Sequence, residues 1–405
     1  MTGWITKPWR SDGVVSRGRK LALGAVSLAT LIGGIAAAQA QPSAANSASS
    51  RLAAHGGAAF AMTNRSTGNQ IVTYRRAADG ALTREGSVST RGKGIGTDLD
   101  TQGGLRLSRD HRFLYAVNAG SDDVTVFAVN GTHLRFVQKV YAGDEPNSLT
   151  LHGDLLYVLD GSVAGNGIRG FRVTSDGSLS PLAHSFRALS SPIAVPGTVQ
   201  FSPDGRLLLV TEKTTNVEMS PPNAIDVFTV RRGGLASALP KRDSSHGVRP
   251  FSLAFRSDHQ LIVAESFNAA PGKSAVSSYR VSSNGGLHVL SGSVRNHQTD
   301  TCWIVVTQDD RYAYTANFGS GTISGYRFDP TGHARLIDGK AAFLGITSQP
   351  VDLDLAAGSR YLYLLLRGTG GVAGFSIQSD GGLTPLGVVK GALPVADGAS
   401  GLAVY

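Results

Sequence analysis

Cysteine is nearly absent from this sequence of 405 residues, which has only Cys302. A single cysteine excludes an intramolecular disulfide and a zinc site built from cysteine ligands. The ten histidines are scattered and lack the spacing of a histidine metal site. Charged residues make up 17% of the chain and form no Lys and Arg stripe interleaved with aromatics, so the sequence gives no case for nucleic-acid binding. Stability must therefore come from a packed core.

Long apolar runs are also absent, apart from one near the N-terminus. Residues 1–20 form a basic leader, residues 21–36 are apolar, and small residues at 38–40 offer a cleavage site. This pattern is typical of a signal peptide over residues 1–40, and it predicts a periplasmic or secreted protein that leaves the membrane after cleavage. The alternative is an uncleaved membrane anchor, because the run is almost long enough to span a bilayer. Residues 41–57, rich in Ser and Ala, are predicted to be a flexible lead-in.

What the chain does contain is a repeated unit, clearest in residues 302–332. The unit reads as three short strands, two of them apolar runs and the third an alternation of apolar and polar residues. Asp309-Asp310 and the Gly-containing segment 318–321 supply the turns, because Asp tolerates turn geometry and Gly reaches positive φ at no steric cost. A fourth strand is predicted over residues 334–343. Four strands this short cannot bury a face alone, so the unit must pack against copies of itself.

Copies of the second strand of this unit recur along the chain. Their last residues lie 42 to 54 residues apart, and they are Asn64, Asn118, Asp160, Glu212, Glu265, Asn317 and Leu366. Four-stranded units at a period of about 50 residues are typical of a β-propeller, in which radial repetition leaves only short strand edges. The sequence therefore predicts an all-β fold, a seven-bladed β-propeller over residues 58–405 with four antiparallel strands per blade.

Closure of the predicted ring can be read from its two ends. Residues 400–404 match an innermost strand that no second strand follows, whereas residues 59–60 begin at a second strand that no inner strand precedes. The two ends are therefore predicted to complete one blade together.

The same spacing predicts a ring of side chains at one mouth of the central channel, where the second strands end. Three consecutive members are acids, namely Asp160, Glu212 and Glu265. Neighbouring carboxylates at a partly buried site raise one another's pKa, which suits proton transfer near neutral pH. The alternative is structural: these side chains, like Asn118 and Asn317, cap strand ends and bond to loop amides. No organic cofactor is expected, although Asp160, Glu212, Glu265 and Asn317 have the oxygen ligands that suit a divalent cation such as Ca²⁺ or Mg²⁺.

The innermost strands are predicted to enter at the same mouth. Most residues at these entry positions are small, and the full set is Gly104, Ser148, Thr198, Ser252, Trp303, Asp352 and Gly401. Trp303 could form an apolar wall for a ligand or could belong to the core. Cys302 has no histidine at a matching position, so a catalytic thiol has little support. Among the histidines, His246 is the one that could reach the mouth.

Two long connections add to this rim. Residues 214–223 and 266–275 follow the second strands of neighbouring blades, so both are predicted to overhang the mouth. Long loops on one rim of a rigid scaffold usually carry its binding site. The alternative is that both are surface loops without a role.

In its repeat frame the chain resembles the seven-bladed propeller lactonases, which include bacterial 6-phosphogluconolactonases and fungal carboxymuconate lactonising enzymes. The resemblance rests on a Pro-led inner strand, a Ser-Pro-Asp-Gly-Arg turn at 202–206, a second strand that ends in Asn or Glu, and Asp-Gly-x-Leu turns at 176–179 and 380–383. It covers nearly all of residues 58–405. The resemblance implies a propeller that hydrolyses a lactone, and hence a small-molecule substrate.

The resemblance also implies a catalytic Arg, His and Glu at one mouth. Glu212 matches the Glu, whereas Pro196-Gly197-Thr198 stands where the family has Pro-Arg-His. Attack of water on a lactone carbonyl needs a base and stabilisation of the oxyanion. Lys213 or Arg249 would then have to supply the positive charge that is missing here.

The predicted site has a catalytic and a binding part. The catalytic residues are Glu212, Glu265 and Lys213, and the substrate-binding residues are Asn118, Asp160, Thr198, Arg249, Trp303, Asn317 and Asp352. Two functions are compatible with this set. The first is a secreted lactone hydrolase that uses a carboxylate at the channel mouth as its base, and the second is a non-catalytic propeller that binds a ligand or protein on the long-loop rim. We expect a monomer in either case.

Overall fold

The computed structural model describes residues 55–405, apart from 163–164, 214–222, 258 and 396. The chain divides into two units, residues 1–43 and 44–405, and the description below concerns the second. The predicted signal peptide (1–40) and most of the predicted lead-in (41–57) lie outside the described residues. Within the described residues, no helix has the length and apolar character needed to cross a membrane.

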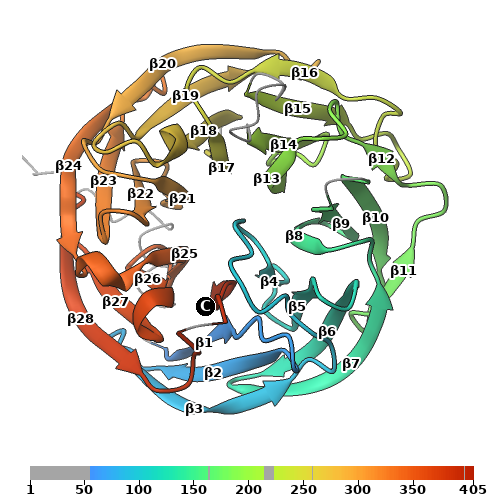
Figure 1. Cartoon of the computed structure of the whole chain (residues 1–405), viewed down its shortest axis with the longest axis horizontal. Helices are drawn as coiled ribbons and strands as arrows, with labels where there is room; N and C mark the ends of the chain where they lie inside the picture. Colours follow the sequence, from blue (N-terminus) through green and yellow to red (C-terminus); the bar gives the residue numbers. More distant parts are fainter. Residues whose placement is uncertain (1–54, 163–164, 214–222, 258, 396) are drawn as a thin grey trace, which may run out of the picture. The chain divides into compact units, whose positions relative to one another are not determined.

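Seven antiparallel sheets form a ring around a central channel, as predicted (Figure 1). Blade 1 contains β1 (Gly57–Met62), β2 (Gln70–Arg76), β3 (Leu82–Ser89) and the late strand β29 (Leu402–Val404). Blade 2 contains β4 (Leu105–Leu107), β5 (Phe113–Asn118), β6 (Asp123–Asn130) and β7 (His133–Tyr141). Blade 3 contains β8 (Pro146–His152), β9 (Leu155–Asp160), β10 (Gly167–Val173) and an outer edge divided into β11 (Leu179–Pro181) and β12 (Arg187–Ala188).

The other four blades follow in chain order. Blade 4 contains β13 (Val195–Phe201), β14 (Leu207–Lys213), β15 (Ala224–Thr229) and β16 (Lys241–Ser244), and blade 5 contains β17 (Pro250–Phe255), β18 (Gln260–Glu265), β19 (Ala275–Val281) and β20 (Leu287–Arg295). Blade 6 contains β21 (Thr301–Val306), β22 (Tyr312–Asn317), β23 (Thr322–Phe328) and β24 (Ala334–Phe343), and blade 7 contains β25 (Pro350–Ala356), β26 (Tyr361–Leu366), β27 (Gly371–Ile377) and β28 (Leu383–Lys390). Three short 3₁₀ turns, η1 (Phe267–Ala269), η2 (Ile346–Ser348) and η3 (Arg367–Thr369), lie in connections.

The second strand of each blade forms the core. From blade 2 to blade 7 this strand is buried along its whole length, because neighbouring blades cover both of its faces. A tyrosine on four of these strands donates its hydroxyl to a glycine carbonyl in a turn of the next blade. The pairs are Tyr115 with Gly177 (3.2 Å), Tyr157 with Gly234 (2.7 Å), Tyr314 with Gly381 (2.8 Å) and Tyr363 with Gly80 (2.6 Å). These turns, three of which are Asp-Gly turns, therefore join adjacent blades.

Blade 1 is completed by the C-terminal strand, which confirms the predicted closure. β29 pairs with β1 in the register Ala59↔Val404, Phe60↔Ala403 and Ala61↔Leu402. Two carboxylates of β25 hold β29 from the other side. Asp352 accepts hydrogen bonds from the backbone N–H of Gly401 (2.7 Å) and the Ser400 hydroxyl (3.1 Å), and Asp354 accepts one from the N–H of Val404 (2.8 Å). Asp352, predicted to bind substrate, thus helps to close the ring.

A segment ahead of β4, residues 98–104, reaches into the middle of the ring, and we call it the plug (Figure 1). The Gln102 side chain pairs with the backbone of Ile304 on β21, with two hydrogen bonds of 2.9 Å. The Gln102 carbonyl accepts hydrogen bonds from the Ser148 (2.6 Å) and Thr198 (2.9 Å) hydroxyls. The Thr101 carbonyl accepts one from the Trp303 indole (2.8 Å). The plug therefore bonds directly to blades 3, 4 and 6.

Candidate functional site

The side chains at the ends of the second strands are buried, and the polar ones form hydrogen bonds within their own surroundings. We call this set the strand-end ring, and its members are Asn64, Asn118, Asp160, Glu212, Glu265, Asn317 and Leu366. The Asn118 amide nitrogen donates to Asp123 (2.7 Å) and Thr125 (2.9 Å), and that of Asn317 donates to Thr322 (2.9 Å) and Ser324 (2.8 Å). Asp160 accepts hydrogen bonds from the N–H of Asp144 (2.9 Å) and from Ser162. The structure does not bring these three together.

Glu212 lies beside the connection that leads into its own blade. Both of its oxygens accept from the Ser190 hydroxyl (3.2 Å), and one accepts from the N–H of Ser191 (3.2 Å). Arg242 approaches to 3.9 Å. Burial, followed by the charge of Asp226, raises the pKa of the Glu212 carboxyl to about 7. Its proton affinity thus suits a base near neutral pH, while its bonds are those of a strand-end cap.

Glu265 has a similar environment in blade 5. Its carboxylate accepts hydrogen bonds from the N–H of Gly247 (2.9 Å) and from the hydroxyls of Ser277 (2.5 Å) and Ser293 (2.8 Å). Burial raises its pKa despite these donors. The Ser293 hydroxyl also lies 3.0 Å from Nδ1 of His246, the histidine predicted to reach the mouth. Within the described residues, no three His, Cys, Asp or Glu side chains cluster closely enough to hold a metal ion.

A second set of polar residues lies just ahead of the inner strands, in the left-handed region of backbone conformation. We call these the left-handed positions, and they are Asp100 (φ 48°), Glu145 (φ 55°), Arg249 (φ 55°), Asp300 (φ 59°) and Gln349 (φ 47°), with Gly398 (φ 65°) in blade 1. Blade 4 differs, because Val195 is already part of β13. A left-handed conformation costs a non-glycine residue about 1–2 kcal/mol, and such strain tends to gather at functional sites.

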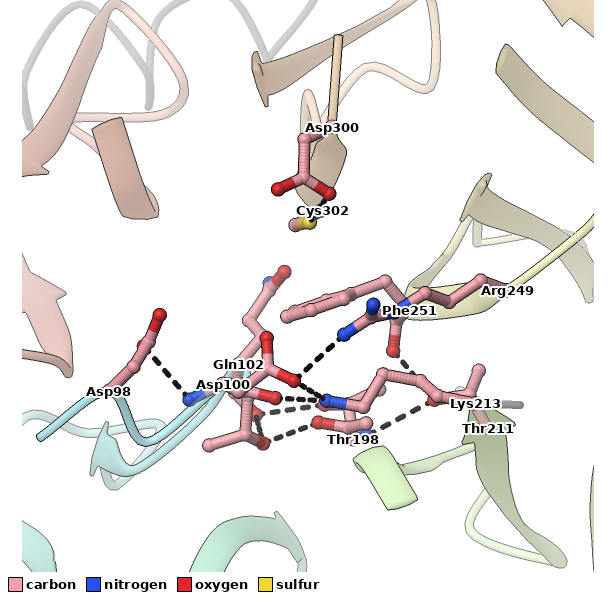
Figure 2. A network of polar contacts seen from close by, with 12 residues as sticks. Asp98, Asp100, Gln102, Thr198, Thr211, Lys213, Arg249, Phe251, Asp300 and Cys302 are labelled. Carbon is pink, nitrogen blue, oxygen red and sulfur yellow. Dashed lines mark hydrogen bonds and ion pairs between the residues drawn. The ribbon is translucent and has the colours of Figure 1, made fainter. Parts of the chain in front are cut away.

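Three of these residues lie around the mouth with Lys213 (Figure 2). Asp100 on the plug forms ion pairs with Lys213 (Nζ to Oδ2, 2.6 Å) and Arg249 (Nη2 to Oδ2, 3.1 Å). Lys213 also donates to the Asp100 carbonyl, and its ammonium lies 4.3 Å from the centre of the Phe251 ring. Burial opposes ionisation of Asp100, but the charges of Lys213 and Arg249 hold its pKa below its usual value. The structure thus brings together two predicted residues, Lys213 and Arg249.

Asp300 differs from Asp100 in its partners. Within the described residues, the one donor bonded to its carboxylate is the thiol of Cys302 (3.3 Å). Burial raises the pKa of Asp300, and the nearby charges of Asp100 and Asp98 raise it further. The hydrogen bond from Cys302 and the charge of Arg249 lower this pKa and offset part of the rise. Burial and the charge of Asp300 raise the pKa of the Cys302 thiol well above its usual value, so this cysteine is a poor nucleophile at neutral pH. Asp300 is therefore a weakly bonded carboxyl group with an elevated proton affinity.

Aromatic rings lie below this polar network. Trp303 packs against Phe251 (ring centres 4.9 Å apart) and Phe318 (6.2 Å), and it is 2% exposed. Its indole is covered by the plug, so the structure places Trp303 in the core. Thr198, also predicted to bind substrate, is buried and bonded to the plug carbonyl of Gln102.

One of the two long connections can be described at this rim. Residues 214–222 lie outside the described residues. In the other connection, Phe267, Asn268 and Ala269 form a left-handed turn with φ between 51° and 56°, and the Arg295 guanidinium stacks 3.9 Å from the Phe267 ring centre. The connection is therefore held in a strained shape by a stacking contact.

The family model described as "Lactonase, 7-bladed beta-propeller" matches residues 51–196 and 266–340, which is more than half of the chain. The chain belongs to this lactonase family. The matched residues include Asp100, Asp300 and Cys302. Lys213, Arg249 and both predicted catalytic glutamates lie in the unmatched residues 197–265, and residues 341–405 of this lactonase-family propeller are unmatched as well.

Solved structures agree with the fold. A putative 6-phosphogluconolactonase from Bacteroides uniformis has a TM-score of 0.67 and 17% identity, with 87% of this chain and 100% of that chain covered. A second, from Bacteroides fragilis, has a TM-score of 0.64 and 19% identity over 90% and 99% of the two chains. A periplasmic gluconolactonase from Pseudomonas aeruginosa has a TM-score of 0.64 and 18% identity over 86% and 99%. No curated protein matches the sequence.

Proposed function

We propose that this lactonase-family propeller hydrolyses a lactone at the channel mouth, with Asp300 as the general base. The observation that supports this assignment is the Asp300 carboxylate, a left-handed residue at the mouth whose one described hydrogen-bond donor is a thiol. Its raised pKa brings its proton affinity closer to that of an effective base at neutral pH. The substrate is a small molecule, and we propose that the protein acts as a monomer.

Arg249 is suited to stabilise the oxyanion. Its guanidinium binds Asp100 through Nη2, while Nε has no hydrogen-bond partner among the described residues. Nε itself is buried, but the side chain as a whole is 26% exposed, so a substrate oxygen can reach the exposed part of the guanidinium. Lys213 is 1% exposed and holds Asp100 in place, which makes it a positioning residue in this proposal.

The reaction then has two proton transfers. Asp300 takes a proton from water as the water oxygen attacks the lactone carbonyl carbon, and the charge that forms on the carbonyl oxygen is stabilised by Arg249. When the tetrahedral intermediate collapses, the ring C–O bond breaks. The leaving alkoxide takes the proton from Asp300, and the product is an open hydroxy acid.

The proposed site of action is the periplasm or the outside of the cell. This proposal rests on the signal-peptide pattern in residues 1–40. One of the solved structures with this fold is a periplasmic gluconolactonase, which supports the proposal without extending to the substrate of this chain.

The test is proton release by the wild type and by Asp300→Asn on a panel of unphosphorylated sugar and aromatic lactones. We expect Asp300→Asn to lose roughly 10²- to 10⁴-fold in kcat, because the amide keeps the shape but cannot accept the proton. Asp338→Asn is the matched control, since Asp338 lies exposed on the outer strand of the same blade. An Asp300→Asn variant with wild-type kcat would overturn the assignment, and a loss in Glu212→Gln instead would identify Glu212 as the base.

A second candidate is a propeller that binds a ligand without turnover. The observation that favours it is the pairing of Lys213 and Arg249 with Asp100, which leaves less positive charge free for an oxyanion. In that case no lactone in the panel would release protons, while a lactone would still protect the wild type, and not Arg249→Met, against thermal unfolding.

A further inference from the structure

A cavity of about 810 Å³ occupies the other half of the channel, beyond the plug. It lies where the inner strands end, which is the face opposite the mouth, and six inner strands contribute to its walls: β4, β13, β17, β21, β25 and β29. Gln102 of the plug lines it as well. Its volume lies within the range of small-molecule binding sites, about 300–1,000 Å³.

The cation of this cavity that lies against the plug is Arg106 of β4. A Cβ atom built on Gly103 of the plug would lie 3.1 Å from Nη2 of Arg106, so the guanidinium packs against the plug backbone. Within the described residues, the Arg106 side chain forms no hydrogen bond and no ion pair closer than 4 Å. Arg76 at the outer end differs, because its guanidinium bonds to the carbonyls of Tyr405 (2.8 Å), Ala77 and His55.

Two carboxamides, those of Gln200 and Gln308, also line the cavity. Neither side chain has a hydrogen-bond partner among the described residues. An amide group both donates and accepts, so each can bind a hydroxyl group of a ligand. The rest of the lining mixes apolar residues, such as Ala254, Ile304 and Leu355, with polar ones, among them His55 and His111. Polar groups that converge in a concave site with apolar walls are typical of a specific small-molecule site.

The two acids near Arg106 disfavour a doubly charged group at this guanidinium, while Arg76 and Arg109 add positive charge elsewhere in the lining. Asp352 and Asp354 on β25 both lie within electrostatic range of Arg106. Asp354 lines the cavity, and its carboxylate already accepts the N–H groups of Val404 and Leu355, both at 2.8 Å. A phosphate dianion beside these carboxylates would be repelled. A carboxylate fits better, because the planar guanidinium can bind it through two parallel hydrogen bonds.

We propose that this cavity, the lower-channel site, binds a small hydroxy-carboxylate, with its carboxylate on Arg106 and its hydroxyl groups on Gln200 and Gln308. The site is separate from the mouth, because the plug lies between them. The proposal therefore stands independently of lactone hydrolysis, although a hydroxy acid is also the product class of that reaction.

The probe is D-gluconate, titrated calorimetrically into the wild type, Arg106→Met and Asp300→Asn. We expect the wild type and Asp300→Asn to bind gluconate equally, and Arg106→Met to bind at least 10-fold more weakly. Arg109→Met, at the exposed rim of the same cavity, is the matched control and should bind within about twofold of the wild type. Neutral D-glucitol and 6-phosphogluconate, whose phosphate adds about 1.5 to 2 negative charges to the carboxylate, should both bind more weakly than gluconate.

Several results would overturn the proposal. These are no gluconate binding by a folded wild type, equal binding by wild type and Arg106→Met, or loss of binding in Asp300→Asn, which would place gluconate at the mouth. If Arg106→Met does not fold, Gln200→Leu provides the same comparison, with at least a threefold weakening expected. Failure of the proposed lactone hydrolysis would appear in proton release and not in these titrations.

Discussion

The strand-end ring and the left-handed positions are neighbours in the fold, yet their side chains have different environments. In blades 3, 5, 6 and 7, the left-handed residue stands one position ahead of the inner-strand partner of a strand-end residue, as the pairs Pro250↔Glu265 and Thr301↔Asn317 show. Glu265 lies within β18, where it pairs with Pro250 and Ala275, and has three donors. Asp300 lies just ahead of β21, outside the strand, and its carboxylate has one weak donor, the Cys302 thiol. Backbone conformation, rather than residue type, decides which acid is available at the mouth.

The largest stability effect should come from breaking the strand-end ring at Glu265. Glu265→Ala removes the acceptor for the Gly247 N–H and the Ser277 and Ser293 hydroxyls, and it leaves these donors buried without a partner. We expect a loss of about 3 kcal/mol in the free energy of unfolding, measured by urea denaturation. Asp300→Asn should lose less than about 1 kcal/mol in the same experiment. Equal losses in the two variants would remove the distinction between the sets.

The next largest stability effect concerns Glu212, and it depends on pH. Its folded pKa of about 7 exceeds its usual value of 4.5, so the folded protein holds a proton that the unfolded chain releases between these values. Stability should therefore fall as pH rises from 4.5 to 7, by about 1–3 kcal/mol, and stay constant above 7 with respect to this group.

Glu212→Gln tests this effect because glutamine is neutral throughout. The variant should have a smaller loss of melting temperature between pH 5 and pH 8 than the wild type. Glu85→Gln, at an exposed ion pair on β3, is the control and should keep the wild-type slope. A Glu212→Gln variant with the same slope as the wild type would show that this carboxyl group is ionised in the folded protein at pH 5.

A smaller stability effect is expected where Lys213 joins the strand end to the left-handed Asp100. Lys213→Met should lower the free energy of unfolding by about 1–2 kcal/mol, because Asp100 then keeps only Arg249 as a partner. The double variant Lys213→Met with Asp100→Asn should lose less stability than the sum of the two single-variant losses, since both substitutions break the same interaction. Fully additive losses, measured by urea denaturation, would mean that the pair contributes nothing to stability.

The smallest effect should be a gain. Gln349→Gly relieves a left-handed conformation, and after the entropy that glycine adds to the unfolded chain we expect stabilisation of about 0.5 kcal/mol. Val195→Gly is the matched substitution in the blade without a left-handed residue, and it should lower stability by about 1 kcal/mol. Opposite signs in calorimetric melting temperatures would confirm that the two positions differ in conformation, and a loss in both would contradict it.

The repeat made the fold predictable, because a period set by four short strands and their turns leaves few alternatives to a closed ring. The directions of the mouth side chains were not predictable from that period. They depend on register shifts in the inner strands, such as that between Pro250 and Leu253. Glu145, Arg249 and Gln349 each precede a proline at the start of an inner strand, but a following proline favours an extended backbone and so did not indicate their left-handed conformation. Asp100 and Asp300 precede threonine, which gave no signal either.

The plug was missed for a different reason. Its sequence has no counterpart in the other blades, and its contacts are distant along the chain. Gln102 bonds to Ile304, 202 residues away. Contacts of this kind leave no periodic trace in a sequence, so Asp100 could not be connected with Lys213 and Arg249 before the structure was known.

The pairing of β29 with β1 also has a consequence for how the protein is made. The Asn64 side chain, just after β1, donates a hydrogen bond to the carbonyl of Gly398, 334 residues later. Blade 1 can therefore be completed only after β29 has been synthesised. Until then the nascent chain has two open sheet edges, and it cannot reach its final stability blade by blade. Ring closure is a late, long-range step that should limit the folding rate. A chaperone that shields those edges would act before this step, and the finished ring would have no further need of it.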